Sequence, residues 1–360
     1  MNNQLKLTAI ALVALTVPML SASAGEKPFP KIIPALEGAP PEGFTIGKGT
    51  TAYNGSVDGS IYKMNLRTGE GETLVAAEPD FNIDTDCYKL GMRVDKRSNY
   101  LFVAGCQEGN VYVFDADSGE EMMQYQLTPQ YESVINDIAI TKKAAYFTDY
   151  ISPAIFSLPL SKNGSIPDNS NAATRIPLTG DFENGDNLLG VFANGIVATP
   201  DGKTLIVGNS GSSKLFRVDP TTGNSDEIII DPPLNGLVPV LDENGDPTFD
   251  EDGFPVLDGA FLDAIVMRDG VLYVLGSGFN TPEDDGVFVV VLADDLLTGT
   301  NMGTITDPDT DFLASGALHG DSLYLNNARY FSYPGCLPEP DGCTQYWITK
   351  VNIYDIGPVE

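Results

Sequence analysis

The sequence predicts an all-β chain folded as a six-bladed β-propeller, and three observations lead to this prediction. The 360 residues include 37 Gly and 25 Pro spread along the chain, which puts turns every few residues and leaves no room for long helices. A pattern of strand, turn and strand recurs along the chain. The recurrences come at intervals typical of propeller blades and leave no block of the chain over.

The first 24 residues are predicted to be a cleavable signal peptide. Lys6 precedes the apolar run 7–20, and residues 22–24 (Ala-Ser-Ala) form a small-residue cleavage site. An anchoring transmembrane helix is the alternative, but the run is short, contains Pro18 and has no basic stop after it. We therefore expect a secreted or periplasmic protein that is not held in a membrane.

The repeat is visible when segments of the chain are compared with one another. Residues 136–148 and 194–207 each read as a strand, a polar turn and a second strand. Residues 59–69, 109–119 and 213–223 each read as a third strand of alternating side chains that ends in a Thr-Gly or Ser-Gly turn. These segments are successive parts of one repeating unit.

Applied along the whole chain, this unit predicts six blades within residues 41–360. The spacing is 45 to 69 residues, against the roughly 40 to 50 that a four-stranded blade needs, so the longer steps contain insertions. Residues 25–40 are expected to run extended to the first blade, and residues 346–354 to close the ring by pairing in the last one. The inner strands are predicted to start near Glu42, Gly91, Asn136, Asn194, Asp263 and Ser315.

The longest interval contains an acidic segment, residues 241–258, which is predicted to be a protruding hairpin. Its Asp242, Asn244 and Asp246 have the spacing of a calcium loop. However, Pro247 occupies the position of the sharp-turn Gly of an EF-hand, and no Glu lies at the distance needed to close the loop. A solvated surface loop is the favoured interpretation.

The charge balance excludes several classes of partner. Only 20 Lys and Arg face 50 Asp and Glu, a formal charge of −30, so nucleic acids and anionic membranes are not expected partners, whereas cations are. The sequence has neither a Gly-rich phosphate loop between a strand and a helix nor a Gly-x-Ser-x-Gly motif. Nucleotide chemistry and serine hydrolysis are therefore unsupported.

Four cysteines in an exported chain predict two disulfides. Proximity in sequence favours Cys87 with Cys106 and Cys336 with Cys343, although four cysteines allow three connectivities. Zinc binding is disfavoured because the chain has a single His and no close pair of Cys.

Several short motifs resemble those of the senescence-marker-protein/gluconolactonase (SMP-30/gluconolactonase/LRE-like) superfamily, which is related to paraoxonases and strictosidine synthases. The resemblance covers roughly the whole mature chain as six blades. It implies a propeller with a calcium ion in its central tunnel and hydrolysis of lactones or related esters. The motifs that carry it are residues 41–43, 91–95, 136–137, 194–203 and 346–351.

Matching the family position by position implies that Ca²⁺ is bound by Glu42, Asn136, Asn194 and Asp263. The residue types agree, because carboxylate and amide oxygens at the starts of different inner strands point to one end of the tunnel and suit a hard cation. The alternative is that these side chains only satisfy the backbone of turns, and a real calcium could also be purely structural.

Three departures from the relatives bear on the substrate. Paraoxonases carry an Asn where this chain has Ala264, and their His dyad has no counterpart because His319 is the only His. Gluconolactonases carry an Asn-Asp pair where this chain has Leu90 and Gly91. The substrates of these relatives therefore do not transfer directly to this chain.

If the site is catalytic, Asp263 is the predicted base that activates water beside the calcium, acting on a small-molecule substrate. Asp149 and Asn209 are candidate substrate contacts because each follows the second strand of a ligand-bearing blade, although both also suit a turn. The alternative function is a non-catalytic propeller that binds a ligand or partner over its tunnel mouth, with a structural calcium or no metal.

Overall fold

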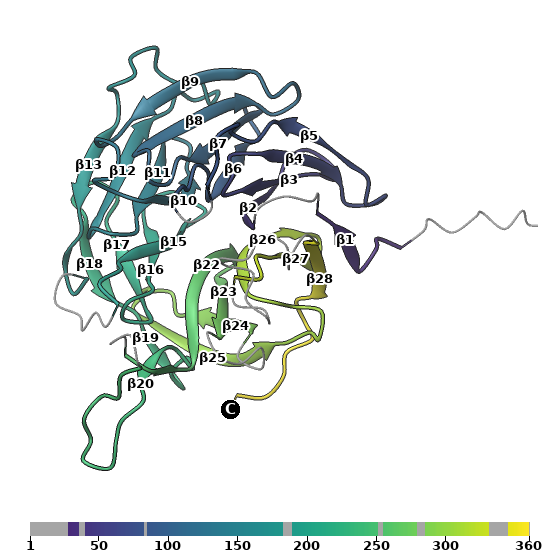
Figure 1. The fold of residues 1–360 in the computed structure, drawn as a ribbon. Coiled ribbons are helices and arrows are strands. Elements are labelled where there is room, and N and C mark those ends of the chain that lie inside the picture. Colours follow the sequence, from purple (N-terminus) through teal and green to yellow (C-terminus); the bar gives the residue numbers. More distant parts are fainter. Residues whose placement is uncertain are drawn as a thin grey trace, which may run out of the picture.

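The computed structural model describes residues 28–35, 40–82, 85–182, 189–250, 255–278, 285–330 and 345–359. Every regular element in these ranges is a β-strand, and the strands form six blades arranged around a ring, which confirms the predicted six-bladed propeller (Figure 1). The described residues include no helix with the length and hydropathy needed to cross a bilayer.

The first three blades are antiparallel sheets of four consecutive strands, joined by turns. Their strands, from the inner to the outer edge, are β2 (Pro41–Ile46), β3 (Thr51–Ser56), β4 (Ile61–Asn65) and β5 (Gly71–Val75); β6 (Met92–Asp95), β7 (Tyr100–Ala104), β8 (Asn110–Asp115) and β9 (Glu121–Gln126); and β10 (Ile135–Ile140), β11 (Ala144–Asp149), β12 (Ala154–Pro159) and β13 (Thr174–Pro177).

Blades 4 and 5 each gain a fifth, parallel strand at the outer edge, which comes from the segment that precedes the blade. Their strands, again from the inner edge outwards, are β15 (Ala193–Ala198), β16 (Leu205–Asn209), β17 (Lys214–Val218), β18 (Asn224–Glu227) and β14 (Thr179–Gly180); and β22 (Ala260–Arg268), β23 (Val271–Gly278), β24 (Gly286–Leu292), β25 (Thr298–Ile305) and β19 (Ile229–Asp231).

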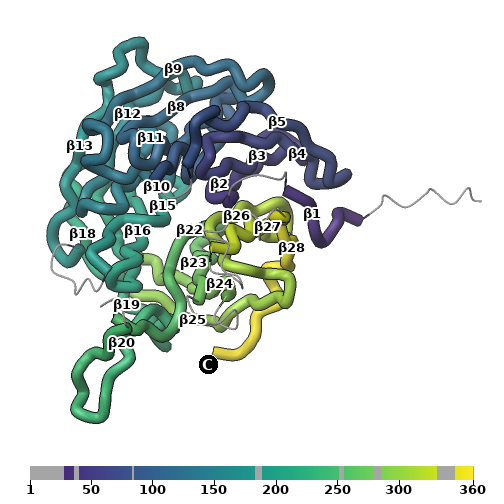
Figure 2. The backbone as a smooth tube through the Cα atoms, in the orientation of Figure 1, coloured from purple at the N-terminus to yellow at the C-terminus, as the bar shows by residue number. Residues whose placement is uncertain are grey.

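Blade 6 is completed by the two ends of the chain. Its inner strands β26 (Leu313–His319) and β27 (Ser322–Asn327) are followed by β28 (Trp347–Asn352), and the N-terminal β1 (Ile32–Pro34) pairs antiparallel with β28 as the outermost strand. Figure 2 shows this N-terminal segment beside the last blade. Strand β1 thus joins the start of the chain to its end and closes the ring.

Side chains of the strands are buried on both faces, because each blade is sandwiched between two others. In β7, Leu101 and Val103 belong to the apolar cluster shared with blade 1, whereas Phe102 and Ala104 belong to the cluster shared with blade 3. Each of the six blade-to-blade interfaces has one such cluster. This burial on both faces explains why some strand sequences are continuous apolar runs, whereas others alternate apolar and polar residues.

The acidic segment between blades 4 and 5 projects from the ring, as Figure 1 shows at β20. It contains the short pair β20 (Val238–Pro239) and β21 (Leu257–Asp258), extended by isolated bridges from Leu241 to Pro247 and from Phe249 to Pro255. The Asp242 carboxylate accepts hydrogen bonds from the backbone of Asn244 and Asp246 at 2.8 and 3.0 Å. It therefore stabilises its own turn.

Candidate metal centre

The four predicted ligands lie at the same irregularity in four different blades. The ladder between the first and second strands shifts register between Pro41 and Phe44, and again in blades 3, 4 and 5. Each shift contains one predicted ligand: Glu42, Asn136, Asn194 or Asp263. Such bulges re-aim side chains away from the regular pleat, here toward the tunnel.

The second strands of other blades hold these bulges in place. The Asn326 side-chain amide of blade 6 donates a hydrogen bond to the Glu42 carbonyl of blade 1 at 2.9 Å. The Thr148 hydroxyl of blade 3 donates to the Asn194 carbonyl of blade 4 at 2.8 Å. The ligand positions are therefore fixed by buried contacts between blades.

All four predicted ligands line one cavity of about 490 Å³ at this end of the tunnel. Its other walls are mainly apolar and aromatic, and none of the described lining residues is Lys, Arg or His. The main members of this apolar wall are Val57, Leu90, Val134, Tyr150, Ile151, Leu189, Phe261, Phe312 and Tyr330.

Glu42 is held by a tyrosine that the sequence did not single out. The Tyr330 hydroxyl donates a hydrogen bond to Oε1 of Glu42. Burial raises the pKa of Glu42 to about 7, although this hydrogen bond opposes the rise. Burial and the nearby Glu42 raise the pKa of Tyr330 well above its ordinary value, so Tyr330 remains a hydrogen-bond donor.

Asp263 is the second buried carboxylate of the cavity, with 9% of its surface exposed. Its pKa is raised well above the usual value, first by burial and then by the negative charges of Glu42 and Asp137. A hydrogen bond from the Asn194 side chain partly offsets this rise. Two carboxylates that burial and mutual repulsion disfavour as anions would gain from a cation between them.

The fit to a hard cation rests on an orphaned atom. The side-chain oxygen Oδ1 of Asn194 is buried and has no hydrogen-bond partner among the described residues. A buried acceptor without a donor costs about 1 to 3 kcal/mol, and a metal ion would satisfy it. No three His, Cys, Asp or Glu side chains cluster in the described ranges, so the candidate ligands are two carboxylates and two amides.

The two predicted substrate contacts do not line this cavity. Asp149 is 1% exposed, and its carboxylate accepts hydrogen bonds from the backbone of Val134 and Ile151 and from the Ser152 hydroxyl. Asn209 accepts one from the backbone of Ser212 at 3.1 Å. Both side chains stabilise turns, which was the alternative interpretation, and we assign neither to substrate.

The aromatic residues of the cavity are functional candidates that sequence reasoning missed. Tyr150 and Tyr330 follow the second strands of blades 3 and 6, at the end of the blade where the ligands lie. This position after the second strand is the signal in the sequence that points to them, and it holds for aromatic residues as well as for polar ones. His319 instead ends β26, the strand end away from the ligands, and its ring packs on Phe29.

The predicted disulfide between Cys87 and Cys106 is present, with a sulfur-to-sulfur distance of 2.07 Å. Both cysteines line the cavity, together with Thr85 and Asp86 of the same loop. The disulfide therefore ties the loop that follows blade 1 to blade 2 and forms part of the cavity wall. Cys336 and Cys343 lie outside the described residues.

Replacing both Cys87 and Cys106 by Ala is expected to lower the free energy of unfolding by about 3 kcal/mol, because the cross-link restricts a loop of 19 residues in the unfolded chain. Urea denaturation measures the change. The double variant is preferable to chemical reduction, which would act on every disulfide. A loss below about 1 kcal/mol would show that this disulfide contributes little to stability.

Comparisons with known proteins identify the fold and no family. No protein-family model and no curated protein matches the chain. A solved protein from Lactobacillus plantarum is 16% identical, with 81% of this chain and 80% of that one covered and a TM-score of 0.52. The major Malassezia sympodialis allergen Mala s 1 is 14% identical over 91% and 97% of the two chains, with a TM-score of 0.54.

The RRP9 WD40 repeats are 10% identical over 89% of this chain and 97% of that one, with a TM-score of 0.53. The β-propeller domain of Myceliophteria thermophila Cps50 (Swd1) is 12% identical over 82% of both chains, with a TM-score of 0.50. At these identities the likeness shows the propeller fold alone. The resemblance to the SMP-30/gluconolactonase superfamily stays a prediction, since none of these structures is named as a member.

Proposed function

We propose that this chain is an exported, calcium-dependent hydrolase of lactones or related esters, secreted or periplasmic according to its predicted signal peptide. The observation that carries the proposal is the set of four oxygen-bearing side chains, each on a bulge of a different inner strand, that line one cavity. The orphaned Oδ1 of Asn194 supports a metal ion among them.

The proposed roles follow from the surroundings of each side chain. Glu42, Asn136, Asn194 and Asp263 would hold the ion, which when bound supplies Lewis-acid polarisation of the ester carbonyl. Asp263 would take the proton from the attacking water, because its carboxylate lines the same cavity as the other three candidate ligands. Tyr330 would keep Glu42 oriented through its hydrogen bond.

The cavity walls favour an uncharged substrate with an apolar part. Phe261, Phe312 and Leu189 offer apolar surface, while no cationic side chain among the described lining residues would attract an anion. The volume of about 490 Å³ is in the range of small-molecule sites.

A non-catalytic propeller that binds a ligand or partner, with a structural calcium or none, is the second candidate. One observation favours it: no His, Ser or Lys lies among the described residues that line the cavity, so Asp263 is the main candidate base there. Some structures with the same fold are WD40 propellers by name, and a shared propeller fold does not by itself imply a shared function.

The deciding experiment pairs the calcium content of the purified protein, measured by elemental analysis, with turnover of a panel of lactones and esters. The wild type is expected to contain one calcium per chain and to turn over at least one member of the panel. Asp263→Ala should lose both.

Asp242→Asn in the projecting hairpin is the matched control, because it also removes one carboxylate and should keep both properties. Bound calcium without turnover of any compound would exclude the hydrolase and leave the second candidate. Absence of calcium from the wild type would exclude both the metal centre and its mechanism.

A further inference from the structure

The end of the tunnel opposite the candidate metal centre is basic, although the chain as a whole is strongly acidic. At this end lie the six turns that connect the first strand of each blade to the second. They carry six of the 20 Lys and Arg of the chain but only three of its 50 Asp and Glu. The cations are Lys48, Lys96, Arg97, Lys142, Lys143 and Lys203 and the acids are Asp201, Asp269 and Asp321.

A cavity of about 450 Å³ opens among these turns, lined by blades 2, 3, 4 and 5. It is distinct from the cavity of the metal centre, because it is lined by the ends of the inner strands and the turns after them. Its charged lining residues are Arg93, Lys96, Arg97 and Lys142 together with Asp95 and Asp201.

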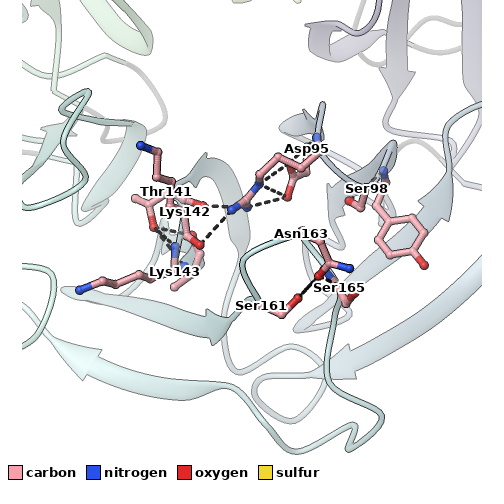
Figure 3. Close-up of polar contacts among 11 residues, drawn as sticks. Asp95, Ser98, Thr141, Lys142, Lys143, Ser161, Asn163 and Ser165 are labelled. Carbon is pink, nitrogen blue, oxygen red and sulfur yellow. Dashed lines mark hydrogen bonds and ion pairs between the residues drawn. The ribbon is translucent and has the colours of Figure 1, made fainter.

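Arg97 connects blade 2 to blade 3 at this cavity. It makes a two-pronged ion pair with Asp95, with Nε to Oδ1 at 2.9 Å and Nη2 to Oδ2 at 2.7 Å. The same guanidinium donates to the carbonyls of Thr141 and Lys142, each at 2.9 Å, as the dashed contacts on these residues show in Figure 3. Arg97 thereby neutralises Asp95 and fixes the backbone of the turn that carries Lys142.

The other charged residues that line the cavity are paired with opposite charges, with two exceptions. Arg93 contacts the buried Asp137 at 3.4 Å, and Lys203 contacts Asp201 at 3.4 Å. Among the described residues, no hydrogen-bond or ion-pair partner lies near the ammonium group of Lys96 or that of Lys142. The lining therefore keeps two uncompensated positive charges.

We propose that this cavity binds a small dianion, of the phosphate monoester or dicarboxylate kind, between Lys96 and Lys142. Two uncompensated ammonium groups in the lining of one concave site match the charge of such a ligand, and a concave site lined by charge of one sign raises the local concentration of the opposite ion. Its volume suits a small molecule. Because the opposite cavity presents carboxylates, a dianion is directed to this end of the tunnel alone.

Isothermal titration of the purified full-length protein with inorganic phosphate and, separately, with succinate tests the proposal. In buffer of low ionic strength, saturable binding of one dianion per chain is expected, and it should weaken in 0.2 M salt because the cations are exposed. Lys96→Gln/Lys142→Gln is expected to weaken binding about tenfold or more. The two ligands distinguish phosphate from dicarboxylate recognition.

Lys48→Gln/Lys162→Gln is the matched control, because it makes the same change in net charge with two exposed lysines that do not line the cavity. It should bind within about twofold of the wild type. No saturable binding of either dianion, or an equal loss in both double variants, would overturn the proposal. Neither outcome depends on calcium or on hydrolysis, so the test is separate from that of the proposed function.

Discussion

Calcium added to the metal-free protein is expected to raise its thermal unfolding midpoint by several degrees, and Asp263→Asn is expected to abolish the rise. A ligand that binds only the folded state stabilises it by about 2.7 kcal/mol at a hundred times its dissociation constant. Asp263 supplies one of only two carboxylates in the candidate ligand set, so its amide would remove half of the negative charge that attracts the ion. Scanning calorimetry in EDTA and in calcium measures the effect.

The same measurement has a predictable dependence on pH. Burial raises the pKa of Glu42 to about 7 in the metal-free protein, so the folded state binds more protons than the unfolded state between about pH 4.5 and 7. The metal-free protein should therefore lose stability as the pH rises through this window. Since calcium needs the ionised carboxylates, the stabilisation by calcium should be small at pH 5 and grow toward pH 8.

Asp242→Asn again supplies the control. The acidic hairpin carries Asp242, Asn244 and Asp246 at calcium-loop spacing, but Asp242 already accepts two backbone hydrogen bonds of its own turn. This variant should keep the full response to calcium. A response that is lost in Asp242→Asn and kept in Asp263→Asn would place the ion in the hairpin and contradict the tunnel site.

The fold could be predicted from the sequence because the same pattern of strands and turns recurs in every blade. Each blade buries both of its faces against others, so each repeats the same alternation of apolar residues and the same turns. The family resemblance supplied the prediction of Glu42, Asn136, Asn194 and Asp263, and the repeat agrees with it, since equivalent positions in a repeat face the same point in the ring. Their shared cavity follows from that symmetry.

The remaining parts of the site depend on contacts that occur only once in the ring, so the repeated sequence pattern does not predict them. Tyr330 reaches Glu42 across 288 residues of sequence, and Cys106 brings the loop of Cys87 into the cavity wall. Asp149 shows the opposite case, a polar residue in a suitable place that its own turn uses. A single sequence does not separate these cases, because turn residues and ligands share the same chemistry.

Strand β1 illustrates the same limit on a larger scale. Residues 25–40 were expected to run extended toward the first blade, whereas Ile32 to Pro34 pair with β28 in the last. Three residues are too few to show a strand pattern of their own, and their partner lies more than 300 residues away.

Ile33→Asp is expected to lower the free energy of unfolding by about 4 kcal/mol or more, because it removes a buried aliphatic side chain and places an unpaired charge in its position. Ile33 is fully buried in the cluster between blades 6 and 1, where it belongs with Phe44 and Ile348. Urea denaturation of the wild type and the variant measures the difference.

The adjacent Ile32→Asp is the matched control, because Ile32 lies on the same strand with 36% of its surface exposed. It introduces the same charge and should cost less than about 1 kcal/mol. If both variants lose the same stability, the effect comes from added negative charge in a chain of net charge −30 and not from the loss of packing at strand β1. If neither variant loses stability, β1 is dispensable, and blades 1 and 6 hold the ring closed through the contacts between β2 and β26.

A large loss of stability in Ile33→Asp alone would show that the ring depends on the N-terminal strand. The Asn326 side chain of blade 6 positions the Glu42 carbonyl of blade 1. Because Ile33→Asp disturbs the interface between these two blades, this variant should also lose the response to calcium.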